Sequence, residues 1–209
     1  MRENFKARGA SNPSMVTITL TPLLRKGIKY ECIAGPGGSC DGHCCWGDGS
    51  IYLYPEDIER FLDFFKVDLD TFLEEHVIAE DAPCHHVKNK IMVPSLMLKE
   101  TKERAACHFQ DDKGHCAVYM IRPFQCVGYP FWKMNTKSKV AWEKVVSFCP
   151  GAKDAPSMPG GKFYSAKEIR GLVREEQKQE AEWEQAMIDW GCDYKSYLRD
   201  WLEKRRVKK

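Results

Sequence analysis

Apolar residues follow a helical period in the segment that begins at Pro55. Proline suits the first position of a helix, and acidic residues directly after it interact favourably with the helix dipole. The apolar positions have the i, i+3, i+4, i+7 spacing of a buried stripe: Ile58, Phe61, Leu62 and Phe65. The pattern predicts an amphipathic helix here, and a second helix near residues 69–78 with Asp68 or Asp70 as its N-cap.

The last third of the chain has the pattern of two further helices. Ser165 and Glu168 form an S-x-x-E capping box, which predicts a long helix that runs to about Trp190. Gly191 is placed to end this helix, and Asp193 is placed to cap the next one. The next helix keeps an amphipathic spacing through Tyr194, Tyr197, Leu198, Trp201 and Leu202.

Alternating and β-branched segments predict short strands. We expect them over residues 16–20, 28–32, 51–54 and 91–98, and within 106–119 around a turn at 111–114. Residues 34–39 predict a Gly/Pro turn, and Pro123 and Pro130 bracket a loop that cannot be a continuous helix.

These elements predict an α+β fold, with a small, irregular, cysteine-rich core and a helical extension. We divide the chain into a polar N-terminal arm (residues 1–14), a cysteine-cluster metal-binding domain (15–155) and a C-terminal helical extension (156–209). The aromatic residues of the extension could bind a protein partner, although such helices pack on their own domain at least as often.

Charge and composition limit the partners and the cellular compartment that we expect for this protein. The formal net charge of +2 is nearly balanced, so the chain lacks a strong overall field for nucleic acid. The basic end at 204–209 leaves contact with RNA or an acidic protein open, but a solvated terminus is the commoner outcome. No apolar run approaches the ~18–20 residues of a membrane span. The basic arm lacks the apolar stretch of a secretory signal, so we expect a cytoplasmic protein, with an organellar matrix as the alternative.

The chain contains ten cysteines. In a reducing compartment, closely spaced cysteines indicate metal ligands before disulfides. Eight of them fall in two groups along the chain: Cys32, Cys40, Cys44 and Cys45, then Cys107, Cys116, Cys126 and Cys149. Cys84 and Cys192 lie outside these groups, and we expect both to be small buried hydrophobes.

The adjacent pair Cys44–Cys45 is the most informative local feature. Neighbouring side chains in an extended stretch point to opposite faces, so two neighbours chelate one ion poorly. The simplest interpretation has one thiolate facing a main centre and the other facing a second centre or the core. Eight cysteines then suit two four-thiolate sites, or one cluster plus structural thiols, and the sequence leaves both open.

These residues carry a family resemblance. The ordered pieces are Cys32…Cys40…Cys44–Cys45, Cys107–His–Phe, Cys116–Ala–Val–Tyr, RPFQCVGYPF at 122–131, and Cys149–Pro–Gly. The chain resembles the YkgJ-like cysteine-cluster family, also described as a zinc- or iron-chelating CxxCxxCC domain, over roughly residues 29–151. It departs from the family in the long gap after Cys32, and in Val127, where the family often has a basic residue.

The resemblance implies that the eight grouped cysteines are metal ligands. All-thiolate sites suit both iron–sulfur clusters and zinc. We favour an iron–sulfur centre, 4Fe-4S, by a small margin, with Zn²⁺ as the alternative. Arg122 either donates to the thiolate centre or pairs with a carboxylate, and Tyr129 belongs to a hydrophobic wall that excludes water from the centre.

The function that follows is a metal-binding protein with an electron-transfer or redox role. The alternative is a zinc-stapled interaction or assembly factor that binds a larger complex through its C-terminal helices. A thiol-based redox enzyme would require an accessible thiol of low pKa.

Overall fold

The computed structural model describes residues 18–34, 40, 42–45, 50–86, 91–101, 106–154 and 161–207. Helices predominate, and the strands form three separate antiparallel pairs within these ranges. The α+β prediction is therefore confirmed. The predicted arm at 1–14 lies outside the described residues, as do 16–17 of the first predicted strand and 35–39 of the predicted turn.

The α-helices are α1 (Pro55–Phe65), α2 (Leu69–His76), α3 (Phe124–Gly128), α4 (Lys133–Thr136), α5 (Lys139–Phe148), α6 (Pro150–Lys153), α7 (Ala166–Asp189) and α8 (Tyr194–Arg206). The strand pairs are β1 (Ile28–Tyr30) with β6 (Lys162–Tyr164), β2 (Val77–Pro83) with β3 (Met92–Leu98), and β4 (Glu100–Thr101) with β5 (Ala106–Cys107). Short 3-10 helices are η1 (Pro22–Lys26), η2 (His43–Cys45) and η3 (Tyr119–Ile121).

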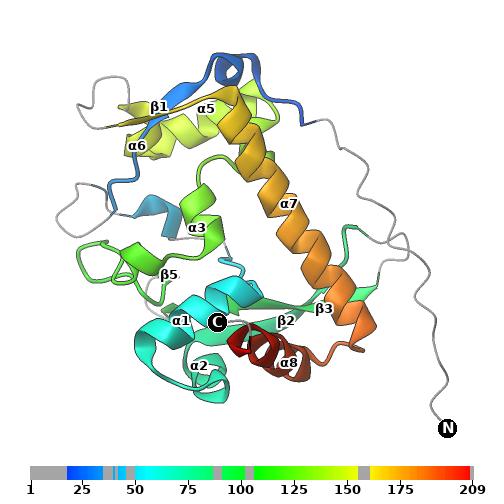
Figure 1. Cartoon of the computed structure of the whole chain (residues 1–209). Helices are drawn as coiled ribbons and strands as arrows, with labels where there is room; N and C mark the ends of the chain where they lie inside the picture. The colour runs from blue at the N-terminus through cyan, green and yellow to red at the C-terminus, as the bar shows by residue number, and fades with distance from the viewer. Residues whose placement is uncertain are drawn as a thin grey trace, which may run out of the picture.

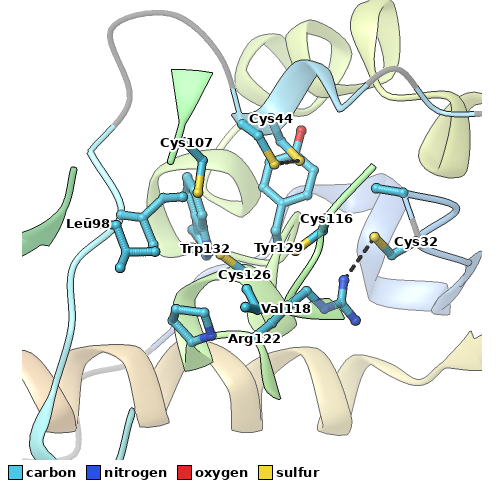
Figure 2. A pocket seen from close by; sticks show the side chains of 14 residues that line it. Cys32, Cys44, Leu98, Cys107, Cys116, Val118, Arg122, Cys126, Tyr129 and Trp132 are labelled. Atoms are coloured by element: carbon cyan, nitrogen blue, oxygen red, sulfur yellow. Dashed lines mark hydrogen bonds between the residues drawn. The ribbon is translucent and has the colours of Figure 1, made fainter. Parts of the chain in front are cut away.

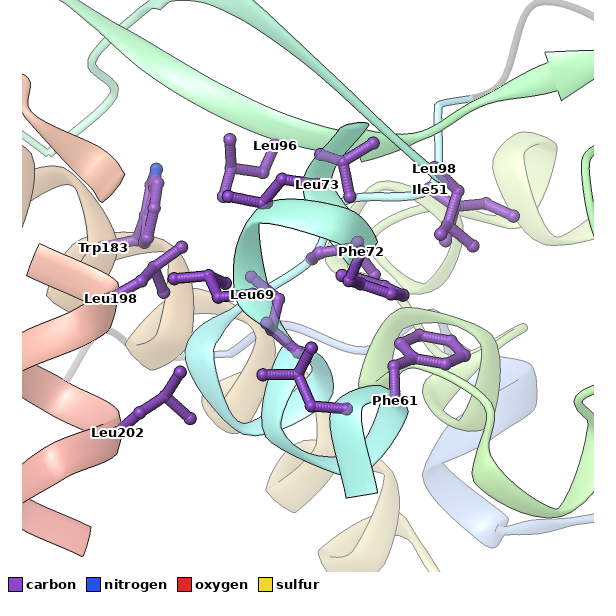
Figure 3. Packing of buried hydrophobic residues seen from close by; sticks show 14 of the residues in the cluster. Ile51, Phe61, Leu69, Phe72, Leu73, Leu96, Leu98, Trp183, Leu198 and Leu202 are labelled. Atoms are coloured by element: carbon purple, nitrogen blue, oxygen red, sulfur yellow. The ribbon is translucent and has the colours of Figure 1, made fainter. Parts of the chain in front are cut away.

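One hydrophobic cluster, the first cluster, fills the space between α1, α2, the β2–β3 pair and α8. Figure 3 shows Trp183 of α7 and Leu198 and Leu202 of α8 directed at the side chains of α1 and α2. Its buried members are Ile51, Leu53, Ile58, Phe61, Leu62, Leu69, Phe72, Leu73, Val77, Cys84, Val93, Leu96, Leu98, Cys107, Phe109, Val118, Trp183, Met187, Leu198 and Leu202.

A second cluster lies at the other end of the molecule, around β1, α5 and α6. Its buried members are Leu20, Leu24, Tyr30, Tyr129, Phe131, Trp142, Val145, Cys149, Ala152 and Ile169. Helix α7 runs between the two ends in Figure 1, with Ile169 in the second cluster and Trp183 in the first. The C-terminal helices therefore contribute to the same body as the cysteine-rich region.

The predicted helix starts are confirmed where the sequence supplied N-caps. Asp68 accepts a hydrogen bond from the amide of Thr71 at 2.9 Å and caps α2. Ser165 and Glu168 form the reciprocal capping box of α7, at 3.2 Å and 2.8 Å. Asp193 caps α8 by accepting from the amide of Ser196 at 3.0 Å.

Several predicted elements differ from the structure. Helix α2 ends at His76, and the next seven residues form β2, which the sequence did not predict because most of this acidic strand is exposed. Segment 51–54 makes only an isolated bridge, Tyr52 to Met97, and Ile18–Leu20 is not a strand.

The segment between Pro123 and Pro130 contains the short helix α3, so the prediction of a loop there was wrong. Both prolines border the helix rather than interrupt it. Pro123 stands at its N-cap, where the missing amide removes no helical hydrogen bond.

Candidate metal centre

Six of the eight predicted cysteine ligands line one cavity. They are Cys32, Cys44, Cys45, Cys107, Cys116 and Cys126, together with Arg122, Tyr129, Trp132 and mainly apolar side chains (Figure 2). The described lining does not include Cys40 or Cys149. All ten cysteines are free thiols, so the structure brings distant thiols together without disulfides.

The cavity cysteines come from separate segments. Cys45 ends η2, Cys107 ends β5, and Cys126 lies in the middle of α3. Cys116 makes an isolated bridge with Gln110. Cys32 follows β1 by two residues, and its segment is held by a hydrogen bond from the amide of Cys116 to the carbonyl oxygen of Ala34, at 3.1 Å.

The cysteines divide between the two hydrophobic clusters. Cys107 is a buried member of the first cluster, and three other cysteines pack against that cluster. Cys149 is a buried member of the second cluster, and two others pack against that one. We call these groups the first set (Cys45, Cys107, Cys116 and Cys126) and the second set (Cys32, Cys44 and Cys149). The neighbours Cys44 and Cys45 thus belong to different sets.

Cys40 lies close to the second set. Its amide donates to the carbonyl oxygen of Ile33 at 3.3 Å, beside Cys32, and its sulfur accepts from the amide of Gly42 at 3.3 Å. Its negative charge also contributes to the raised pKa of Cys149, after the larger effect of burial.

The separations between the cysteine sulfurs can be compared with those expected for different kinds of metal centre. Four thiolates around one zinc ion lie about 3.8 Å apart, because each is about 2.3 Å from the ion at a tetrahedral corner. The sulfurs of Cys44 and Cys45 are 4.0 Å apart, but no three cysteine sulfurs in the described chain lie within 4.8 Å of one another. In a 4Fe-4S cluster each cysteine binds a different iron, so its four sulfurs lie farther apart than those around one ion. The described sulfurs therefore do not form the compact group that one tetrahedral zinc ion holds.

A tight group of possible ligands lies elsewhere: His86, Glu180 and Glu184, whose ligand atoms are within 4.8 Å of one another. Both carboxylate oxygens of Glu184 accept backbone amides, from His85 and His86, at 2.8 Å each. His86 Nε2 is 3.2 Å from Glu180 Oε2. These contacts fasten the segment after β2 to α7.

The cavity thiols are in an environment that disfavours a lone thiolate. Burial raises the pKa of Cys107 to about 12 and that of Cys116 to about 11. The pKa of Cys126 is also raised, first by burial and then by the charges of Cys107, Cys45 and Cys116. A hydrogen bond between the adjacent thiols raises the pKa of Cys44 and lowers that of Cys45. A cation would compensate these neighbouring negative charges, and its binding would displace the protons.

Arg122 donates to a thiol sulfur, as one of its two predicted roles requires. Its Nη1 lies 3.0 Å from Cys32 Sγ (Figure 2). Its guanidinium stacks 3.7 Å above the ring of Tyr119, and its Nε donates to the Tyr119 carbonyl oxygen at 2.9 Å. The positive charge is thus fixed beside the second set.

Tyr129 contributes a wall of the cavity and a buried hydroxyl. The side chain is 5% exposed, and its hydroxyl has no hydrogen-bond partner in the described structure. Burial raises its pKa well above the usual range, followed by the charges of Cys149 and Cys44. In Figure 2 the hydroxyl end of the ring points toward Cys44. An unpartnered buried donor beside the sulfurs suits a site that binds an inorganic group with acceptor atoms.

Two residues that the sequence analysis did not single out position this site. Asp57 of α1 is 1% exposed, and its Oδ1 accepts from the amide of Phe124 at 2.9 Å and from Arg60 at 2.5 Å. Arg60 also donates to the carbonyl oxygen of Arg122 at 3.0 Å. The acidic first turn of α1 was visible in the sequence, but only as a partner for the helix dipole.

The two cysteines outside the pattern differ from each other. Cys84 is buried, as predicted. Cys192 is exposed, so the prediction of burial was wrong there. It lies in the turn between α7 and α8 with φ 66°, which places it at the surface.

The family model "CxxCxxCC: putative zinc- or iron-chelating domain" matches residues 32–150, which is more than half of the chain. The chain belongs to this family, as its sequence resemblance predicted. No solved structure matches the chain. Among the described helices, none has both the length and the apolar character needed to cross a membrane.

Proposed function

We propose that the cysteines hold an iron–sulfur centre, 4Fe-4S in type, and that the protein carries electrons. The observation that supports this most directly is the arrangement of the thiols: six of them line one apolar cavity, and no three sulfurs of the described residues lie within 4.8 Å of one another, as they would around a single zinc ion. A bound cluster would supply one-electron oxidation and reduction.

The protein's own groups would tune that chemistry. Tyr129 and Trp132 keep water from the cavity, and Trp132 is fixed by donating from Nε1 to the Gln125 carbonyl oxygen at 2.8 Å. Arg122 places a positive charge against Cys32, which stabilises the more negative, reduced state of a thiolate-bound centre. Burial and hydrogen bonding to sulfur are the usual means by which a protein sets such potentials.

The competing proposal is a zinc-stapled interaction factor that binds a larger partner through α7 and α8. The apolar side of α8 is occupied, since Leu198 and Leu202 belong to the first cluster. A partner would therefore meet its outer face, where Lys204 and Arg206 are exposed. Because both helices carry core residues, surface substitutions test this proposal better than truncation does.

The metal content of anaerobically prepared protein separates the two proposals. We expect bound iron with equimolar acid-labile sulfide, visible charge-transfer absorption, and an EPR signal on reduction. The Cys84→Ser variant serves as a control, because it removes a buried thiol outside the cavity and should keep the iron. Colourless protein with stoichiometric zinc under these conditions would favour the zinc-stapled factor.

A further inference from the structure

We infer that the cysteines form two four-thiolate centres, one built from the first set and one from the second set completed by Cys40. The division falls at the peptide bond between Cys44 and Cys45. This inference rests on the proposed metal binding, and it adds the number of centres and the ligands of each.

The conformation of the adjacent pair supports this division. Cys44 and Cys45 lie in η2, a 3-10 helix with about three residues per turn, so their Cα–Cβ bonds point about 120° apart, although the two sulfurs approach to 4.0 Å beside the cavity. The amide of Cys45 donates to the carbonyl oxygen of Gly42 at 2.7 Å and fixes this turn. As a result Cys45 packs against the first cluster and Cys44 packs against the second. A turn of this kind distributes two neighbouring thiols between two centres.

Backbone segments approach each other closely around Cys32 and Cys149. Cys149 stands at the N-cap of α6, within the second cluster. A Cβ placed on Gly151 would lie 2.0 Å from the carbonyl oxygen of Glu31, so α6 packs directly on the backbone next to Cys32. The amide of Cys40 is bonded to Ile33 on the other side of Cys32. Cys32, Cys40 and Cys149 are thereby gathered where α6 packs on the segment after β1.

The first set is supported by other elements. Cys107 and Cys126 are carried by β5 and α3, and α3 is fastened to α1 through Asp57. These contacts lie beside the first cluster. The two sets are thus carried by different elements, which are joined where the amide of Cys116 donates to the carbonyl oxygen of Ala34, and the cavity lies where they meet.

Arg122 lies at this meeting point. Its side chain donates to Cys32 of the second set, while its backbone leads four residues later to Cys126 of the first. Two neighbouring thiolate centres repel each other, and a fixed guanidinium between them reduces that repulsion.

The test compares Cys126→Ser with Cys149→Ser in the full-length chain, prepared without oxygen. Iron, zinc and acid-labile sulfide per chain would be measured together with EPR spectra of the reduced proteins. We expect each variant to keep about half of the wild-type metal, with a different residual signal in each, and the double variant to keep none. Cys192→Ser, at an exposed thiol, should keep all of it.

Native mass spectrometry of the wild-type protein counts the centres without any substitution, so the inference stays testable if a variant does not fold. Mass increments for two centres support it. Complete loss in Cys126→Ser with full retention in Cys149→Ser would overturn it in favour of one centre plus structural thiols. Complete loss in both variants, or a single increment in the wild type, would overturn it as well. Wild-type protein that binds no metal would overturn the proposed function itself, which is a different result from a single centre.

Discussion

The carboxylate of Asp57 accepts a hydrogen bond from the backbone amide of Phe124 at 2.9 Å, across 67 positions of the chain. The same carboxylate accepts from the amide of Tyr54 at 3.1 Å and from Arg60. A buried acid therefore connects the start of α1 to the start of α3, two residues before Cys126. The position of this thiol depends on a contact that contains no cysteine.

Replacing Asp57 with alanine is expected to lower the free energy of unfolding by about 3 kcal/mol, because it leaves a part-buried Arg60 and two amides without their partner. Chemical denaturation of the metal-free protein measures this. Glu56→Ala, in the same acidic turn, is the matched control, and it should cost about 0.5 kcal/mol through the helix dipole. Equal losses in the two variants would contradict a positioning role for Asp57. In the loaded protein, Asp57→Ala should also bind metal more weakly.

Gly42 is expected to tolerate no side chain, whereas Gly171 should accept one. Gly42 has φ 73°, and a Cβ there would lie 2.1 Å from Gln110 Nε2 and 2.6 Å from the Gly114 carbonyl oxygen. Gly42→Ala should therefore displace η2 from the turn before Cys116, with a loss of about 1–3 kcal/mol and of bound metal. Gly171 lies in α7 with nothing within 4 Å of a Cβ, so Gly171→Ala should stabilise by about 0.5–1 kcal/mol. Thermal unfolding and metal analysis of both variants check this. A Gly42→Ala variant with unchanged stability and metal content would contradict the close packing around Gly42.

Local signals explain which parts of the fold could be predicted from the sequence. The capping box of Ser165 and Glu168 lies within four residues, and it correctly located the start of α7. Strand β2 has no such signal, because its pairing with β3 over seven residues depends on the partner strand. Helix α5 was also missed, although its cap, Ser138, was present in the sequence.

The candidate site, like the fold, could be predicted only where its signals are local in the sequence. The ordered cysteine motifs identified the family and the residue types of the candidate ligands. They could not divide the ligands into sets, since that division depends on which hydrophobic cluster each side chain packs against. The support of α3 by Asp57 also required the fold, because no local pattern relates positions this far apart.

Replacing Arg122 with glutamine is expected to lower the reduction potential of the bound centre. The guanidinium at 3.0 Å from Cys32 Sγ stabilises added negative charge, so its loss should shift the potential by roughly −50 to −100 mV, or about 1–2 kcal/mol for one electron. Spectroelectrochemical titration measures the shift. Arg199→Gln, which removes a surface ion pair with Asp70, should leave the potential unchanged. An unshifted potential in Arg122→Gln would show that this charge does not act on the centre.

Metal-free and loaded protein are expected to respond to pH in opposite directions. The pKa values of Cys107 and Cys116, about 12 and 11 in the fold, exceed those of unfolded thiols. Their contribution to the stability of the metal-free fold is therefore complete below about pH 8.5 and is lost as the pH rises toward these values. Metal binding releases the same protons, so the loaded protein should hold its metal more tightly as the pH rises. Denaturation of the metal-free protein and chelator competition with the loaded protein, from pH 6 to about pH 10, measure the pH dependence of stability and of metal affinity. If both quantities changed in the same direction with pH, thiolate ligation would be contradicted.

Tyr129→Phe is expected to have opposite effects on the metal-free and the loaded protein. The Tyr129 hydroxyl is buried without a partner, and an unsatisfied group of this kind costs about 1–3 kcal/mol. Its removal should therefore stabilise the metal-free fold, while the loaded protein loses a donor directed at the sulfurs and binds its metal more weakly. Tyr119→Phe is the contrasting variant, because the Tyr119 hydroxyl donates to the Cys32 carbonyl oxygen at 2.7 Å and its loss should destabilise both forms. Denaturation of each form, combined with chelator competition, separates the two patterns. If Tyr129→Phe raised the stability of both forms equally, the hydroxyl would have no role toward the metal, and Tyr129 would act only as an apolar wall.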